Sequence, residues 1–101
     1  MIRHVVLFHW KPSATAADVS KVEAALHQLP NKIACIQSYR FGRDLGAQEG
    51  NADFALVADF VDEEALQVYG THPDHLEVIG TLIRPITERR TAIQYVIDSA
   101  G

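Results

Sequence analysis

The sequence predicts an α+β protein of 101 residues, with one antiparallel sheet and helices on one of its faces. Three observations support this fold class. Short runs rich in Val, Leu and Phe alternate with segments whose apolar residues recur at helical spacing. The order of these segments is β-α-β-β-α-β, which is the ferredoxin-like arrangement with a four-stranded antiparallel sheet. The strands also carry apolar residues on both faces, although the helices can cover only one.

The first strand and first helix have clear sequence signals. Apolar residues on both alternating faces predict a strand at Ile2–Trp10, which Lys11-Pro12 ends. Thr15 and Asp18 have the spacing of a capping box, so a helix is predicted to begin there and to end at Pro30. The apolar residues at helical spacing in this segment are Val19, Val22, Leu26 and Leu29.

The middle of the chain predicts two strands and a short helix. We expect strands at Ile33–Gly42 and at Ala52–Phe60, joined by a polar loop at Arg43–Asn51 that contains two glycines. Asp62 can cap a second helix whose first turn is acidic, as the helix dipole favours. Gly70 then interrupts the helical pattern.

A new helix is predicted from Pro73, because proline fits the first position of a helix. It ends near Arg84-Pro85, and a last strand follows at Thr91–Ile97. The second helix of the fold is therefore broken in two. The apolar residues at helical spacing in its later part are Leu76, Ile79 and Ile83.

The sheet face that the helices leave bare carries Val5, Leu7, Ala55 and Val57. A whole sheet face of this kind in water would be an unusually large apolar patch. A second copy of the chain is the simplest cover, so we expect a homodimer joined through the sheet face.

We expect a single domain over residues 1–101. Its composition excludes several classes of function. The net charge is −4, whereas nucleic-acid binding needs a basic surface, and no apolar run is long enough for a transmembrane helix. The first ten residues lack the parts of a signal peptide. A single Cys35 excludes a disulfide framework and suits a reducing compartment, so we expect a cytoplasmic protein.

The residues from Tyr69 to His75 are the richest in chemistry, because they bring a phenol and two imidazoles to the junction of two helices. His75 is the third residue of the new helix, where the helix dipole disfavours the imidazolium and Asp74 favours it. A neutral histidine can act as a general base, and Tyr69 could orient a substrate oxygen. The alternative is structural: Tyr69 as a core aromatic and His72 as a polar residue of the helix junction.

The first strand contributes two more histidines. His4 shares a face with Val6 and Phe8, so it either has a hydrogen-bond partner in the core or faces a ligand. Strict alternation places His9 on the opposite face, near the expected dimer contact. His27 falls on the polar side of the first helix and is expected to be solvated.

We expect no metal and no cofactor. The spacing His72-x-x-His75 occurs in ligand pairs, but a proline lies between them and a third ligand is missing, whereas catalytic zinc needs three. The chain has no Gly-rich phosphate loop and no G-x-S-x-G nucleophile elbow. Cys35 has no basic neighbour in sequence and is predicted to be an inert thiol.

Together, these residues resemble the stress-responsive A/B barrel domain family, also called dimeric α/β-barrel proteins. The resemblance covers nearly the whole chain. Its most specific part is a Tyr-x-x-His-Pro-x-His stretch, Tyr69 to His75, that follows a helix start at Phe60-Val61-Asp62-Glu63-Glu64. The other similar segments are Ile2-Arg3-His4-Val5-Val6-Leu7-Phe8, Asp53-Phe54-Ala55-Leu56 and Gln94-Tyr95-Val96-Ile97-Asp98.

The resemblance implies a ferredoxin-like fold that dimerises through the sheets into an α/β barrel. One plant member, olivetolic acid cyclase, closes a polyketide thioester by aldol condensation with a histidine base beside a tyrosine. By motif these roles fall on His75 and Tyr69, with His4 facing the same cavity. Three interpretations stay open: cofactor-free acid/base chemistry on a small carbonyl compound, a non-catalytic small-molecule-binding or stress-associated dimer, and a cofactor-free monooxygenase.

Overall fold

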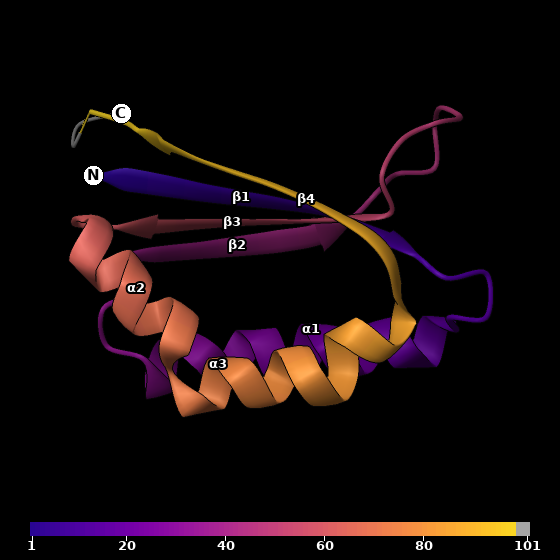
Figure 1. Ribbon diagram of the computed structural model, residues 1–101. Coiled ribbons are helices and arrows are strands. Elements are labelled where there is room, and N and C mark those ends of the chain that lie inside the picture. The colour runs from indigo at the N-terminus through magenta and orange to yellow at the C-terminus, as the bar shows by residue number, and fades with distance from the viewer. Residues whose placement is uncertain (99–101) are drawn as a thin grey trace.

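The protein is described by a computed structural model of residues 1–98, and its fold is the ferredoxin-like α+β arrangement that the sequence predicts. The four strands pair in the antiparallel order β2-β3-β1-β4. Figure 1 shows α1 and α3 side by side under one sheet face and α2 at one end of the sheet, while no helix of residues 1–98 covers the opposite face. The elements are β1 (Ile2–Trp10), α1 (Ala16–Lys32), β2 (Ser38–Arg43), β3 (Phe54–Phe60), α2 (Glu63–Thr71), α3 (Pro73–Val78) and β4 (Thr87–Val96).

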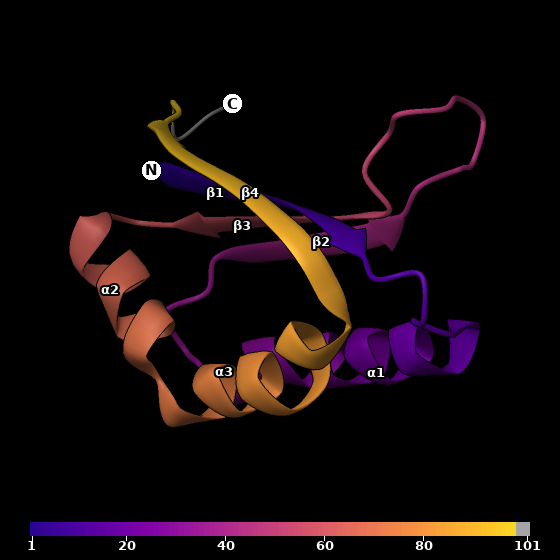
Figure 2. The same ribbon diagram turned by 45° about the vertical axis from the view of Figure 1, so that its right-hand side comes forward.

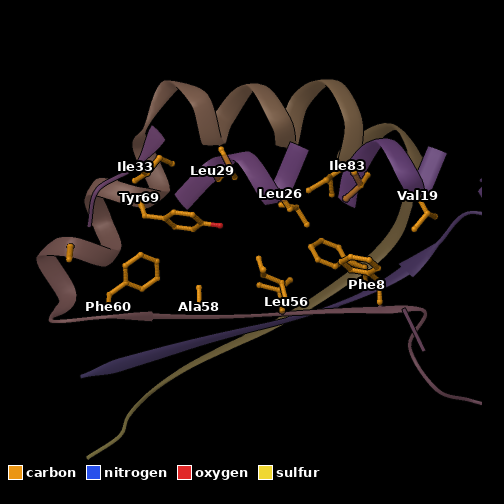
Figure 3. Close-up of a cluster of buried hydrophobic side chains, with 14 residues drawn as sticks. Phe8, Val19, Leu26, Leu29, Ile33, Leu56, Ala58, Phe60, Tyr69 and Ile83 are labelled. Carbon is orange, nitrogen blue, oxygen red and sulfur yellow. The ribbon is translucent and has the colours of Figure 1, made fainter. Parts of the chain in front are cut away.

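The hydrophobic core lies between the sheet and the helices (Figure 3). Alternate residues of β1 and β3 point into it: Val6 pairs with Leu56, and Phe8 pairs with Phe54. Burying apolar side chains in this layer is the main force that holds the helices on the sheet. The buried members are Val6, Phe8, Val19, Val22, Leu26, Leu29, Ile33, Phe54, Leu56, Ala58, Phe60, Ala65, Tyr69 and Ile83.

Helix α1 begins as predicted and ends later. Thr15 and Asp18 form the complete capping box, each side chain bonding the other's backbone N–H. The prediction that Pro30 ends the helix is wrong, because the helix continues to Lys32. Pro30 lies in the last turn, where its missing N–H costs one hydrogen bond, and the N–H of Ile33 restores the pattern by donating to the Leu29 carbonyl.

Strand β2 is shorter than predicted, beginning at Ser38 rather than at Ile33. Ile33 is fully buried at the end of α1, so its apolar character comes from core packing and not from a strand. Ile36 follows in a turn in which its N–H donates to the Ile33 carbonyl. The strand extends one residue past the predicted end, to Arg43.

The last two strands also differ at their ends. Strand β3 begins at Phe54 rather than Ala52, and β4 begins at Thr87 rather than Thr91. The charged start of β4 pairs with the end of β1, and a bulge interrupts the register at His9 and Trp10. Bulges bend a strand, and β4 curves from the helix layer up to the sheet edge (Figure 2).

The broken helix is present as predicted. Asp62 caps α2 through the backbone N–H of Ala65, and His72 separates α2 from α3. Beyond α3 the chain forms a wide π-helical turn at Ile79–Ile83 and a 3-10 turn at Arg84–Ile86. One predicted packing residue is corrected: Leu76 is 51% exposed, whereas Ile83 is buried.

The bare sheet face keeps its apolar character within the described residues. Leu7, Ile93 and Tyr95 are exposed large hydrophobics on it, and Val5 and Val57 are half-buried. None of the helices in residues 1–98 combines the length and apolar character that crossing a membrane requires.

Candidate functional site

A cavity of about 70 Å³ lies between the helix-facing side of the sheet and the helices. Its walls are mostly apolar, and its polar groups come from β1, the α2–α3 junction and β4. One buried water needs roughly 10–15 Å³ of such space, so the cavity fits a molecule of only a few non-hydrogen atoms. Figure 3 shows several of its walls. The lining residues are His4, Val6, Phe8, Leu26, Leu56, Tyr69, His75, Val78, Ile79, Ile83 and Arg90.

His75 is held in one tautomer by the helix break. It is the third residue of α3, and its Nδ1 lies 3.3 Å from the Gly70 carbonyl oxygen. A carbonyl can only accept, so Nδ1 carries the hydrogen and donates it, which leaves Nε2 as an unprotonated acceptor. Burial lowers the pKa of His75, the bond to Gly70 opposes this shift, and the charges of Arg90 and His72 lower it further.

His4 is held in the opposite tautomer. It is 7% exposed on β1, and its Nδ1 lies 2.8 Å from the amide nitrogen of Gln94 on β4. That amide nitrogen can only donate, so Nδ1 accepts and Nε2 carries the hydrogen. Burial lowers the pKa of His4 to about 4, with smaller contributions from the charges of Arg90 and His75. At neutral pH the ring is therefore an uncharged donor.

Tyr69 packs against His75 and lies edge-on to His4. Its ring centroid is 4.0 Å from that of His75 and 6.3 Å from that of His4. Its hydroxyl lies 2.7 Å from the hydroxyl of Tyr39 on β2. Burial raises the pKa of Tyr39 to about 12, while the bond to Tyr69 lowers it; burial and the neighbouring Tyr39 raise the pKa of Tyr69 as well. Both phenols are protonated at neutral pH, so neither is a base.

The other predicted residues lie outside this cavity. The His72 side chain caps α3 by accepting from the Asp74 N–H, a structural role. His9 faces away from the cavity, with its Nε2 3.0 Å from Arg89. His27 is exposed and packs edge-on against Phe41.

The sequence raises two other kinds of site, a metal site and a reactive thiol. Among residues 1–98, no group of three His, Cys, Asp or Glu side chains is arranged to hold a metal ion. The Cys35 thiol is half-buried and donates to the Ala65 carbonyl oxygen over 3.4 Å.

Sequence reasoning missed three residues of the site: Tyr39, Arg90 and Gln94. Arg90 and Gln94 lie opposite Phe8 and His4 in the β1–β4 pairing, which puts both on the cavity side. The sequence signal for them is the even spacing of residues 90, 92 and 94 on one strand face. Tyr39 carried no such signal, because its role depends on how close β2 comes to α2.

The arrangement can do acid/base chemistry. His75 offers an unprotonated nitrogen and His4 offers an N–H, and both rings line one small apolar cavity. A base and a donor that differ in tautomer can act on two parts of the same molecule.

Three solved structures show what the chain is similar to. A dimeric ferredoxin-like protein of unknown function from Thermobifida fusca is 41% identical, with a TM-score of 0.88 over 95% of this chain and 90% of that chain. The hydroxynitrile lyase from Passiflora edulis is 20% identical, with a TM-score of 0.83 over 97% of this chain and 94% of that chain. An antibiotic biosynthesis monooxygenase is 14% identical, with a TM-score of 0.77 over 97% and 99%.

The last two likenesses show the fold alone, because their identities are low. A search of curated proteins gives no match. The family model described as "Stress responsive A/B Barrel Domain" matches residues 2–97. This match covers nearly the whole chain, so the protein belongs to the stress-responsive A/B barrel domain family.

Proposed function

We propose that this protein is a homodimeric enzyme that moves a proton on a small carbonyl compound, without a cofactor, in the cavity between sheet and helices. The observation that carries the proposal is the pair of opposite tautomers: Nε2 of His75 is a free acceptor, and Nε2 of His4 is a donor. A stability role alone does not require two buried imidazoles at one cavity.

In the proposed reaction, Nε2 of His75 removes a proton from the carbon next to the carbonyl. The electron pair of that C–H bond moves onto the carbonyl oxygen and gives an enolate. The N–H of His4 donates to this oxygen as its negative charge develops. The enolate carbon then takes back a proton from the His75 imidazolium. In an aldol step it instead attacks a second carbonyl carbon, whose oxygen becomes an alkoxide and takes that proton from His75.

Tyr69 supports this reaction by position and not by proton removal. Its ring lies against His75 and fixes the plane of the imidazole. The lowered pKa values of both histidines suit the roles, because a base must be unprotonated before it accepts a proton. The cavity size favours small substrates over long polyketides.

The dimer in this proposal forms through the bare sheet face. Two observations support this dimer. Leu7, Ile93 and Tyr95 expose apolar surface on that face, and the similar protein from Thermobifida fusca is described as dimeric. Burial of this face should exceed about 1,200 Å² in total. Sedimentation at micromolar concentration should give a dimer, and Ile93→Lys should shift it toward monomer. A monomeric parent protein would refute this part.

Hydrogen–deuterium exchange tests the chemistry without knowledge of the substrate. Small ketones and aldehydes in D₂O should lose the hydrogens next to the carbonyl faster with the protein than without it, as NMR can follow. His75→Ala should slow this exchange by roughly 10²-fold or more. His27→Ala is the matched control, because His27 is exposed and does not line the cavity, and it should leave the rate unchanged.

The competing function is a non-catalytic dimer that binds small molecules. It is favoured by one observation, the engagement of the Tyr69 hydroxyl by Tyr39. If no carbonyl compound exchanges above background, and His75→Ala melts far below the parent protein, this second function is correct. Oxygen uptake with the same compounds tests the monooxygenase alternative.

A further inference from the structure

Among the described residues that line the cavity, Arg90 is the only one that carries a charge at neutral pH, and it lies on β4 opposite Phe8. Aspartate and glutamate are absent from that lining. The positive charge of Arg90 acts on both His4 and His75, lowering the pKa of each. Its guanidinium is thus close enough to influence both reacting rings.

Arg90 differs from three other arginines of the protein. Arg3 is paired with Asp59 at 2.9 Å, Arg43 with Glu23 at 2.7 Å, and Arg89 lies 3.0 Å from His9. Within residues 1–98, no side-chain hydrogen bond or ion pair is formed by Arg90. Arg40 and Arg84 form no such bond in the described part of the chain either, so what distinguishes Arg90 is that its unpaired guanidinium lines the cavity.

The position of Arg90 also suits a ligand that enters from outside. A wider surface hollow of about 430 Å³ adjoins the cavity and shares Phe8, Ile79, Ile83 and Arg90 with it. These four residues therefore stand between the hollow and the cavity. The hollow also contains Arg84, Thr87 and Glu88, so two cations face one carboxylate there. This charge balance favours an approaching anion over a cation.

From these observations we infer that the substrate is a small oxo acid, whose carboxylate binds Arg90 while its carbonyl end reaches His4 and His75. This inference rests on the proposed function for the carbonyl part alone. Guanidinium and carboxylate match in shape and form two parallel hydrogen bonds. A bound carboxylate would also offset the charge that disfavours the His75 imidazolium, so such a substrate would assist its own deprotonation.

The test compares pyruvate with pyruvamide, in which an uncharged amide replaces the carboxylate at nearly the same size. Binding is measured by NMR on the complete protein, and exchange of the methyl hydrogens is measured in D₂O. We expect pyruvate to bind about tenfold or more tightly than pyruvamide, because only the carboxylate brings a negative charge to pair with the guanidinium.

Arg90→Gln should remove that preference. Arg89→Gln should keep it, because Arg89 is the next residue of β4 and lies on the other sheet face. Thermal melts of both variants check that the fold is retained.

Each outcome decides one proposal. Equal binding of the two compounds, or an unchanged preference in Arg90→Gln, would overturn the oxo-acid inference and leave the proposed proton transfer standing if exchange occurs. Binding of pyruvate that depends on Arg90, without exchange of its methyl hydrogens, would support anion recognition and count against proton transfer by His75.

Discussion

Acidification is expected to begin destabilising the protein above the range in which most carboxylates titrate, because His4 takes up a proton in the unfolded chain but not in the folded protein. The pKa of this ring is about 4 in the folded protein and about 6.5 when unfolded. Between these values the unfolded chain binds more protons than the folded one. The contribution is fully present above pH 6.5 and is lost as the pH falls to about 4. One pKa unit corresponds to about 1.36 kcal/mol, so the loss is about 3 kcal/mol.

The assay is urea unfolding at pH 7, 5.5 and 4.5, followed by the fluorescence of Trp10 at one protein concentration. His4→Asn is the informative variant, since asparagine keeps an acceptor for Gln94 and does not titrate. Its free energy of unfolding should fall much less over this range. His75 adds a loss of the same sign, because its pKa is also lowered, and this loss remains in the variant.

Losses from the carboxylates are the same in both proteins: Arg43 lowers the pKa of Glu23 from its ordinary value of 4.5, so that contribution begins to be lost only at the acid end of the window. Arg3 holds the pKa of Asp59 below its ordinary value, so the stabilisation from that pair is lost only below about pH 4. Equal losses of stability in the parent protein and in His4→Asn between pH 6.5 and 4.5 would show that His4 is not buried as an uncharged ring, and the reasoning would fail.

Three further perturbations have defined outcomes. Tyr39→Phe should lower the free energy of unfolding by about 1–3 kcal/mol, and adding Tyr69→Phe should cost less than the sum of the two single changes, as a double-mutant cycle in urea can show. Thr15→Ala removes the α1 cap and should cost about 1 kcal/mol in the same assay; no loss would contradict the capping box. Leu26→Ala should cost about 2–5 kcal/mol and enlarge the cavity, so bulkier ketones should bind; unchanged ligand preference would place binding elsewhere.

Part of the site could be predicted from the alternation of side chains between the two faces of β1. A strand side chain lies on one face or the other according to its position, so placing His4 with Val6 needed no knowledge of the rest of the fold. The same holds for His75, because proline in the first turn of α3 fixes where that helix starts.

Contacts between distant segments could not be predicted in this way. The bond from Gln94 to His4 depends on the register of β4 against β1, which changes at the bulge between His9 and Trp10. The hydroxyl contact between Tyr39 and Tyr69 depends on the spacing between a sheet edge and a helix. Ile33 was misassigned to a strand because an apolar residue at a helix end looks the same locally as one at a strand start.

The opposite origins of the two imidazoles have a stereochemical consequence. His4 rises from the sheet and His75 comes from the helix layer, so a flat substrate between them presents only one of its faces to the base. For a ketone with a methylene group beside the carbonyl, the two hydrogens of that group are then no longer equivalent. In D₂O the protein would label one of the two prochiral positions, and the product would carry its deuterium with a single handedness.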